Sequence, residues 1–270
     1  MTNTSNHSQM LGSLEVFDGL QNGERPSRAH DYVIVVERAL HRCALAVGRE
    51  LRDDWDERDA VHDTPAAAHV LAQADELFLP LAGGSPAERL DRFRKGFLKA
   101  IHRSQRELQR GAKSQSGEAP ALTLTLAYVD GTRLYLGHVG DDRCYLMRGR
   151  GLHRMTTDHT AAPPSSDLPR VSDPMLSRKL LNVIGGFSDD LEAETLALNL
   201  QPNDIILLCT PGIGTQVPEP AMEEVLHAAT QDRTMSLEAV ANALFRAVPE
   251  HLKSMDRSLA LARLGGSVED

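Results

Sequence analysis

The sequence lacks several features that would place it in particular protein classes. It has three cysteines among 270 residues, and each stands among apolar neighbours, far from the others: Cys43, Cys144 and Cys209. Neither a disulfide framework nor a zinc cluster is expected, and we predict buried, reduced thiols. No apolar run reaches the roughly 18 residues that a membrane helix needs. The eleven histidines show no HExxH spacing, so we assign them no common metal site.

The chain also lacks an excess of basic residues. Lysine and arginine total 29 against 38 aspartates and glutamates, a formal net charge of -9. Without a basic stripe to neutralise phosphates, nucleic-acid binding is not expected. The first nine residues are polar and do not place a basic segment before an apolar one, so no secretory signal is expected. We therefore expect a cytoplasmic protein that binds neither nucleic acid nor membrane.

Length and composition favour one globular domain. Hydrophobic residues make up 41% and charged residues 25%, and a chain of this length can bury a substantial core. Residues 1–12 are rich in Asn, Ser, Thr and Gln and cannot bury enough apolar surface to offset the entropy of ordering. We predict a disordered tail over residues 1–12 and a single domain over residues 13–270.

The N-terminal part of the chain gives the weaker structural signals. Apolar patterns predict short strands around residues 14–16 and 32–36, which could pair as a hairpin. For residues 37–51, strand and helix both remain open, because the apolar spacing there suits either. Residues 52–74 indicate no clear element.

The signals are clearer from Ser85 onward. Ser85 offers an N-cap and Pro86 a first helical position, and an apolar stripe predicts a helix over residues 86–110. Residues 122–128 alternate as a strand with one buried face, and Asp130-Gly131 supplies a hairpin turn. Further strands are expected at 134–136, 144–147, 152–155, 204–209 and 259–264, and helices at 219–229 and 237–248, the second capped by Ser236. Meanders interrupted by blocks of helices indicate an α+β fold with antiparallel sheets and helices packed outside.

The segment 136–160 reads LGHVGDDRCYLMRGRGLHRMTTDHT and resembles the central motif of the type 2C (PPM-type) protein serine/threonine phosphatases. Asp141, Arg143 and Asp158 stand at the family's spacing. The resemblance implies a β-sandwich of two antiparallel sheets flanked by helices, in α/β/β/α layers. Three later segments extend it to about residues 119–264: NVIGG at 182–186, DIILLCTPG at 204–212 and DRSLA at 256–260.

In that family two divalent ions, usually Mn²⁺ or Mg²⁺, are bridged by carboxylates and activate the water that attacks phosphorus. The resemblance makes Asp31, Asp141 and Asp256 candidate metal ligands. For the bridging aspartate it leaves two candidates. Asp75 is favoured by chain order, and Asp18 by the glycine that follows it.

Four positions depart from the family pattern. Pro211 stands where a metal-binding aspartate is expected, and its side chain can coordinate nothing. Arg257 follows Asp256 in place of asparagine and brings a permanent cation beside the expected pocket. Glu76 replaces the glycine after Asp75, and the Asn-Glu pair before Asp31 is replaced by Ala-His.

Several candidates also have a purely structural interpretation. Asp141 follows a glycine and could cap its own turn. Asp158 and His159 could hold the loop that leaves the sheet. Asp75 could be a solvated surface charge, and Arg25, the candidate for phosphate binding, could be an exposed turn residue.

Two functions follow from these observations. The departures favour a catalytically impaired pseudophosphatase that regulates by binding a phosphorylated protein or another signalling protein. The alternative is an active Mn²⁺- or Mg²⁺-dependent serine/threonine phosphatase whose metal site is rebuilt with Asp142, Glu76 or Glu24.

Overall fold

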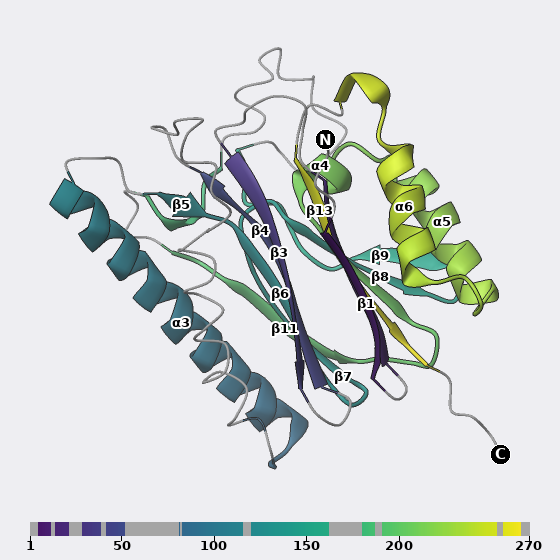
Figure 1. Cartoon of the computed structure of the whole chain (residues 1–270). Coiled ribbons are helices and arrows are strands. Elements are labelled where there is room, and N and C mark those ends of the chain that lie inside the picture. The colour runs from purple at the N-terminus through teal and green to yellow at the C-terminus, as the bar shows by residue number, and fades with distance from the viewer. Residues whose placement is uncertain are drawn as a thin grey trace.

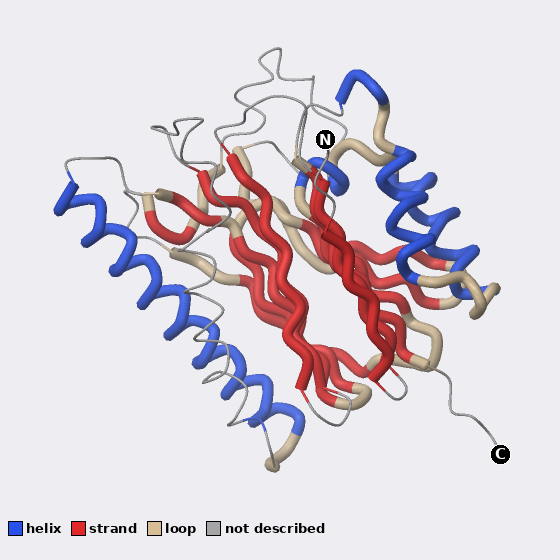
Figure 2. Tube along the Cα trace, in the orientation of Figure 1, coloured by secondary structure: helices blue, strands red, loops and turns tan. Residues whose placement is uncertain are grey.

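The computed structural model describes residues 5–11, 14–21, 29–38, 42–51, 81, 83–115, 120–161, 180–186, 191–252 and 256–265. These residues form two antiparallel β-sheets packed face to face, with helices on both outer faces (Figures 1 and 2). The α/β/β/α layers predicted from the sequence are therefore confirmed.

The first sheet joins strands from both ends of the chain. Its order is β1-β2-β13-β12-β8-β9, and every neighbouring pair is antiparallel. The strands are β1 (Ser5–Leu11), β2 (Leu14–Gln21), β13 (Arg257–Leu264), β12 (Ile205–Cys209), β8 (Arg143–Arg148) and β9 (Gly151–Arg154).

The second sheet is built around β4. Its order is β10-β5-β4-β6-β7-β11, and β3 pairs with β4 along its whole length. The strands are β3 (Ala29–Arg38), β4 (Arg42–Leu51), β5 (Ala121–Leu122), β6 (Leu124–Asp130), β7 (Arg133–Val139), β10 (Ile184–Gly185) and β11 (Glu194–Asn199).

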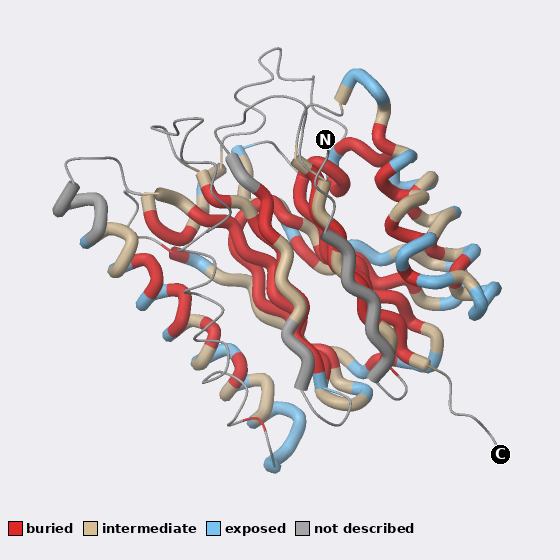
Figure 3. Tube along the Cα trace, in the orientation of Figure 1, coloured by how far each residue is buried: buried red, intermediate tan, exposed pale blue. Residues whose placement is uncertain are grey.

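Helices cover the two outer faces. Helix α3 (Pro86–Gln115) packs on the second sheet through Phe93, Phe97 and Ile101, and α5 (Glu219–Gln231) and α6 (Leu237–Ala247) pack on the first. A third apolar cluster fills the space between the sheets. Buried positions accordingly face inward from every layer (Figure 3). The short helix α4 (Pro211–Gly214) follows β12, and a 3₁₀ turn, η4 (Glu250–Leu252), precedes β13.

Most of the elements predicted from Ser85 onward are confirmed. Helix α3 begins at Pro86, where Ser85 Oγ accepts from the Glu88 amide at 3.3 Å and the Glu88 carboxylate accepts from the Ser85 amide at 2.7 Å. This reciprocal pair is a capping box. Ser236 caps α6 by accepting from the Ala239 amide at 3.2 Å.

Three expectations for the strands are corrected. Residues 14–16 and 32–36 do not pair as a hairpin, because β2 lies between β1 and β13 while β3 pairs with β4 in the other sheet. The predicted tail is wrong over Ser5–Leu11, which form β1. The segment 122–128 buries both faces rather than one, since its sheet is covered by α3 on one side and by the first sheet on the other.

The structure also decides the predictions for residues 42–51 and for the three cysteines. Residues 42–51, which could have been strand or helix, are strand β4. Cys43, Cys144 and Cys209 are buried free thiols, as predicted. No helix in the described part of the chain combines the length and apolarity needed to span a membrane.

Candidate functional site

Three of the candidate ligands come together at one end of the sandwich. Asp31 lies in β3, Asp141 directly follows the Gly140 corner after β7, and Asp256 directly precedes β13. Asp31 and Asp141 are buried, and Asp256 is partly buried. Both Asp141 and Asp256 act electrostatically on Asp31. Carboxylates that are distant in the sequence therefore share one corner of the fold.

Asp31 is held by a hydrogen bond rather than left open. The Thr210 hydroxyl donates to its carboxylate. The pKa of Asp31 is raised to about 7, chiefly by burial; Asp256 and Asp141 contribute to this rise, and Arg49 and Thr210 oppose it. The carboxyl group therefore takes up a proton far more readily than an exposed aspartate does.

A cation that the sequence analysis did not single out stands in this corner. The Arg49 guanidinium, from β4, forms an ion pair with Asp141, and both side chains are nearly buried, with exposed fractions of 13% and 11%. Burial alone would lower the pKa of Arg49. The neighbouring acids Asp141, Asp142 and Asp31 raise it, so the guanidinium stays charged. The signal in the sequence was a charged pair, Arg49-Glu50, at the end of an apolar strand.

A break in the sheet fixes the backbone at Arg49. Beside β4, β6 pairs with residues 42–47 and β5 with residues 50–51, and Thr123 stands between β5 and β6. The Thr123 amide donates to the Arg49 carbonyl at 3.0 Å, and the Arg49 amide donates to the Thr123 hydroxyl at 2.9 Å. The side chain of Thr123 thus completes the bonding where the regular ladder is interrupted.

Gly48 permits this arrangement. A Cβ atom at Gly48 would lie 2.2 Å from the Thr123 carbonyl oxygen and 2.2 Å from the Tyr32 hydroxyl oxygen. These two groups are themselves hydrogen-bonded, with Tyr32 Oη donating to the Thr123 carbonyl at 2.6 Å. Only glycine leaves room for that bond, which ties β3 to the strand break beside Arg49.

Asp142 is the most deeply buried acid of the corner. It is fully buried, and neither carboxylate oxygen has a hydrogen-bond partner within the described residues. Burial raises its pKa well above the ordinary value and Asp141 adds to the rise, while Arg49 and the Thr123 hydroxyl, which lies outside hydrogen-bond geometry, oppose it. Asp142 therefore holds a proton more readily than an exposed aspartate does.

The residues that carry the family resemblance most clearly form a scaffold behind Asp141. Arg143 donates to both carboxylate oxygens of Asp158, at 3.1 Å from Nε and 2.7 Å from Nη2, and also donates to the Gly214 carbonyl of α4. The His159 amide donates to the Gly140 carbonyl at 2.7 Å. Asp158 and His159 thus hold the loop leaving the sheet, the structural role proposed for them from the sequence.

The segment after β12 brings no carboxylate to the corner. Pro211 is buried and begins α4, and the preceding residue is Thr210, whose hydroxyl bonds Asp31. Gly212 packs tightly on the start of β13, since a Cβ there would lie 2.1 Å from the Asp256 carbonyl oxygen. Figure 1 shows α4 beside the start of β13. This end of the first sheet therefore has a proline where a ligand was expected.

Of the remaining predicted residues, Asp18 is described and lies away from the corner. Asp18 pairs with Ala260 in β13, four residues beyond Asp256, which places it about 13 Å farther along the sheet. Arg25 and Asp75 lie outside the described residues. Glu24 and Glu76, named as possible replacement ligands, also lie outside them.

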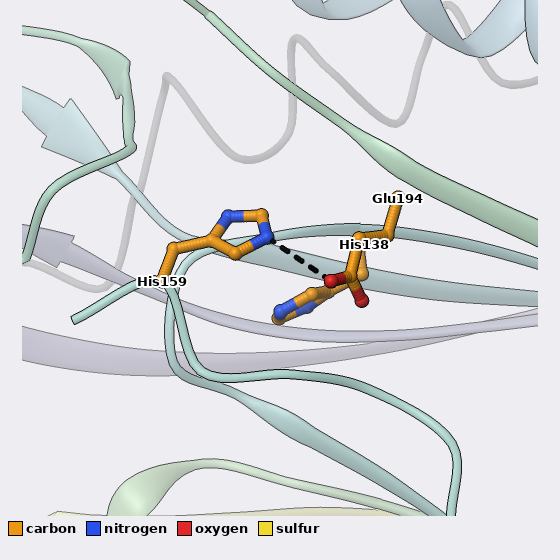
Figure 4. Close-up of side chains that lie close together, drawn as sticks. All are labelled: His138, His159 and Glu194. Carbon is orange, nitrogen blue, oxygen red and sulfur yellow. Dashed lines mark ion pairs between the residues drawn. The ribbon is translucent and has the colours of Figure 1, made fainter. Parts of the chain in front are cut away.

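A second cluster of potential ligands contains His138, His159 and Glu194 (Figure 4). His138 Nε2 lies 3.0 Å from the Thr157 carbonyl oxygen, and its Nδ1 lies 2.8 Å from the Thr125 hydroxyl. A carbonyl can only accept, so Nε2 carries the proton and Nδ1 accepts from the hydroxyl. Both ring nitrogens of His138 are therefore engaged.

His159 is held in the same manner. Its Nδ1 accepts from the Gly140 amide at 3.2 Å and from the Asn182 side-chain amide at 2.9 Å. Its Nε2 faces Glu194 Oε1 at 3.7 Å. A metal here would have to break the hydrogen bonds of His138, so the cluster serves as a partly buried polar support for the Gly140 corner.

Comparison with known proteins agrees with this fold and with the central motif. Residues 58–165 match the family model described as "Protein phosphatase 2C". The serine/threonine phosphatase stp of Listeria monocytogenes is 29% identical over 121 residues, which are 43% of this chain and 47% of that protein. The chain thus matches about half the length of these curated relatives.

Solved structures extend the likeness over nearly the whole chain. The structure of the serine/threonine phosphatase of S. agalactiae has a TM-score of 0.68 at 16% identity, and the match covers 97% of this chain and 99% of the phosphatase. The catalytic domain of PstP, in complex with two manganese ions, has a TM-score of 0.64 at 18% identity, covering 98% and 99%. At these identities the structures establish the fold. The chain therefore has the fold of these phosphatases over nearly its whole length, and over residues 58–165 its sequence is similar to the protein phosphatase 2C family.

Proposed function

We propose that this chain is a PPM-type phosphatase-like domain with impaired catalysis, acting as a regulatory pseudophosphatase that binds a phosphorylated protein. The observation that carries the proposal is the composition of the corner around Asp31 and Asp256, where Pro211 offers no ligand atom. A cytoplasmic signalling role, with a phosphoprotein as partner, belongs to the same proposal.

The residues of the corner do not fit a pair of divalent ions. Mn²⁺ or Mg²⁺ is the ion that the family resemblance implies, and hard cations of this kind need several oxygen ligands close together. Among the described side chains, the carboxylates of the corner form no group of three with ligand atoms in mutual reach. Asp31 is bonded to Thr210, and Asp141 is paired with Arg49. We therefore derive no metal-activated step for this chain.

One observation favours the alternative, an active phosphatase with a rebuilt metal site. Asp142 is buried and its carboxylate oxygens have no hydrogen-bond partner within the described residues. A divalent ion would compensate such a group, as an uncompensated buried carboxylate is costly. This alternative predicts metal-dependent turnover that needs Asp142.

The test is hydrolysis of p-nitrophenyl phosphate and of a phosphothreonine peptide, with Mn²⁺ or with EDTA. We expect wild type and Asp256→Ala to show the same background rate under both conditions, and the peptide to bind without being hydrolysed. Asp130→Ala is the matched control, because Asp130 pairs with Arg42 at the surface. Mn²⁺-dependent turnover that Asp256→Ala or Asp142→Asn abolishes would establish the alternative. Pro211→Asp asks whether returning a carboxylate creates activity.

A further inference from the structure

The corner of Asp31, Asp141, Asp142 and Asp256 poses an electrostatic problem. Asp31, Asp141 and Asp142 are buried. Asp31 lies within electrostatic reach of the other three acids, and Asp142 lies within reach of Asp141. Charged groups removed from water must be paired or neutralised. A cation among these acids, either an ion or a side chain, would meet this requirement.

Arg49 meets this requirement from within the chain. Its guanidinium bonds Asp141 directly and acts electrostatically on Asp31 and Asp142 as well. It therefore interacts with three of the four acids. A guanidinium is always charged and is more weakly hydrated than an ammonium group, which suits it to a nearly buried ion pair.

The position of this cation is set by the sheet. The backbone of Arg49 bonds Thr123 through both its amide and its carbonyl, at the break between β5 and β6. Gly48 lets the Tyr32 hydroxyl pack directly beneath the same break. Arg49 is thus anchored on two strands before its side chain reaches the corner, which limits the entropy lost in forming the ion pair.

We propose that the Arg49 guanidinium takes the place of a divalent ion in this domain and holds the carboxylate corner together without metal. The inference deepens the proposed pseudophosphatase function and rests on the same site. It makes a separate claim, however. Mn²⁺ should not change the stability of the wild-type domain. Once the charge of Arg49 is removed, the stability should depend on Mn²⁺.

The experiment compares thermal unfolding of the full chain with EDTA and with MnCl₂, for wild type and Arg49→Met, which keeps the length of the side chain and removes its charge. The wild-type melting temperature should be the same in both. Arg49→Met should melt lower in EDTA by about 6 °C or more and regain much of that loss with Mn²⁺. Electron paramagnetic resonance of Mn²⁺ should show binding at least about tenfold tighter to the variant than to wild type.

Arg42→Met is the matched control. Arg42 lies in the same strand and also pairs with an aspartate, but its side chain is 47% exposed. It should cause little loss of stability and no response to Mn²⁺. Arg49→Lys, which keeps a cation, should stay folded and indifferent to the ion, and it supplies the comparison if Arg49→Met does not fold.

Two results would overturn the inference. One is a wild-type chain that Mn²⁺ stabilises and that binds the ion tightly. The other is an Arg49→Met chain that folds and does not respond to Mn²⁺. Neither depends on binding of the phosphothreonine peptide. If the chain does not bind the peptide but wild type and Arg49→Met respond to Mn²⁺ as expected, the regulatory function is rejected and the role of Arg49 stands.

Discussion

Replacing Gly48 with alanine tests whether the backbone beside Arg49 is as tightly constrained as the contacts indicate. The new Cβ would lie 2.2 Å from both the Thr123 carbonyl oxygen and the Tyr32 hydroxyl oxygen. One of these atoms is backbone inside a sheet, so the clash cannot be relieved by a simple change of rotamer. Either the strands separate locally or the Tyr32 ring leaves its place.

The expected cost can be assembled from two contributions. Overpacking a core by one methyl group costs about 1–3 kcal/mol. Loss of the buried hydrogen bond from Tyr32 to Thr123 adds about 1 kcal/mol. We therefore expect Gly48→Ala to lower the free energy of unfolding by about 3 kcal/mol, a large fraction of the stability of an ordinary domain.

Urea denaturation followed by circular dichroism measures this quantity. Gly151→Ala is the matched control, because Gly151 also lies in a strand but a Cβ there would meet only the ring of His153, at 3.0 Å. Tyr32→Phe in the Gly48→Ala background should recover part of the loss, since it removes one of the three atoms that would lie within 2.4 Å of the new Cβ. If the free energies of unfolding of Gly48→Ala and Gly151→Ala differ by less than about 0.5 kcal/mol, the proposed anchoring of Arg49 is wrong.

Two further predictions concern the scaffold behind Asp141. Arg143→Ala removes the paired hydrogen bonds to Asp158 and the bond to the Gly214 carbonyl, and should cost about 2–4 kcal/mol of stability, measured by urea denaturation. Burial and the neighbouring His159 lower the pKa of His138 to about 4. His138 therefore stabilises the fold fully above pH 6.5 and progressively less as the pH falls towards 4, by up to about 3 kcal/mol. His138→Gln should remove this part of the acid sensitivity.

Arg133→Ala is the control for Arg143→Ala. It removes a partly exposed arginine whose bond to Asn199 lies at the surface, and it should change stability by less than about 1 kcal/mol. An Arg143→Ala loss no larger than this would contradict the scaffold role. For His138, equal pH dependence in wild type and His138→Gln between pH 7 and pH 4 would show that its protonation is not linked to folding.

The sequence by itself determined the layered fold and the central scaffold. The alternation of residues 122–128 and the apolar stripe of α3 are local patterns, and hydrophobic period suffices to predict a strand and a helix there. The α/β/β/α layers and the motif around Asp141 were predicted from the family resemblance. The roles of Asp158 and His159 were also predicted, because they bond groups fewer than twenty residues away.

Pairing between distant strands was decided by the tertiary structure. The patterns of residues 14–16 and 32–36 suited a hairpin. In the structure β2 instead pairs with β13, and β3 pairs with β4. Alternation fixes which faces a strand buries, but it does not specify the neighbour that completes its hydrogen bonds.

The content of the corner also depended on the tertiary structure. Asp31, Asp141, Asp256 and the cation Arg257 could be named from the sequence. Arg49 could not, because it reaches Asp141 across 92 residues of chain. An arginine in a strand is unremarkable until the break at Thr123 and the space left by Gly48 direct it towards buried acids. Electrostatic pairing depends on distance in space, and only the packed sheets set that distance.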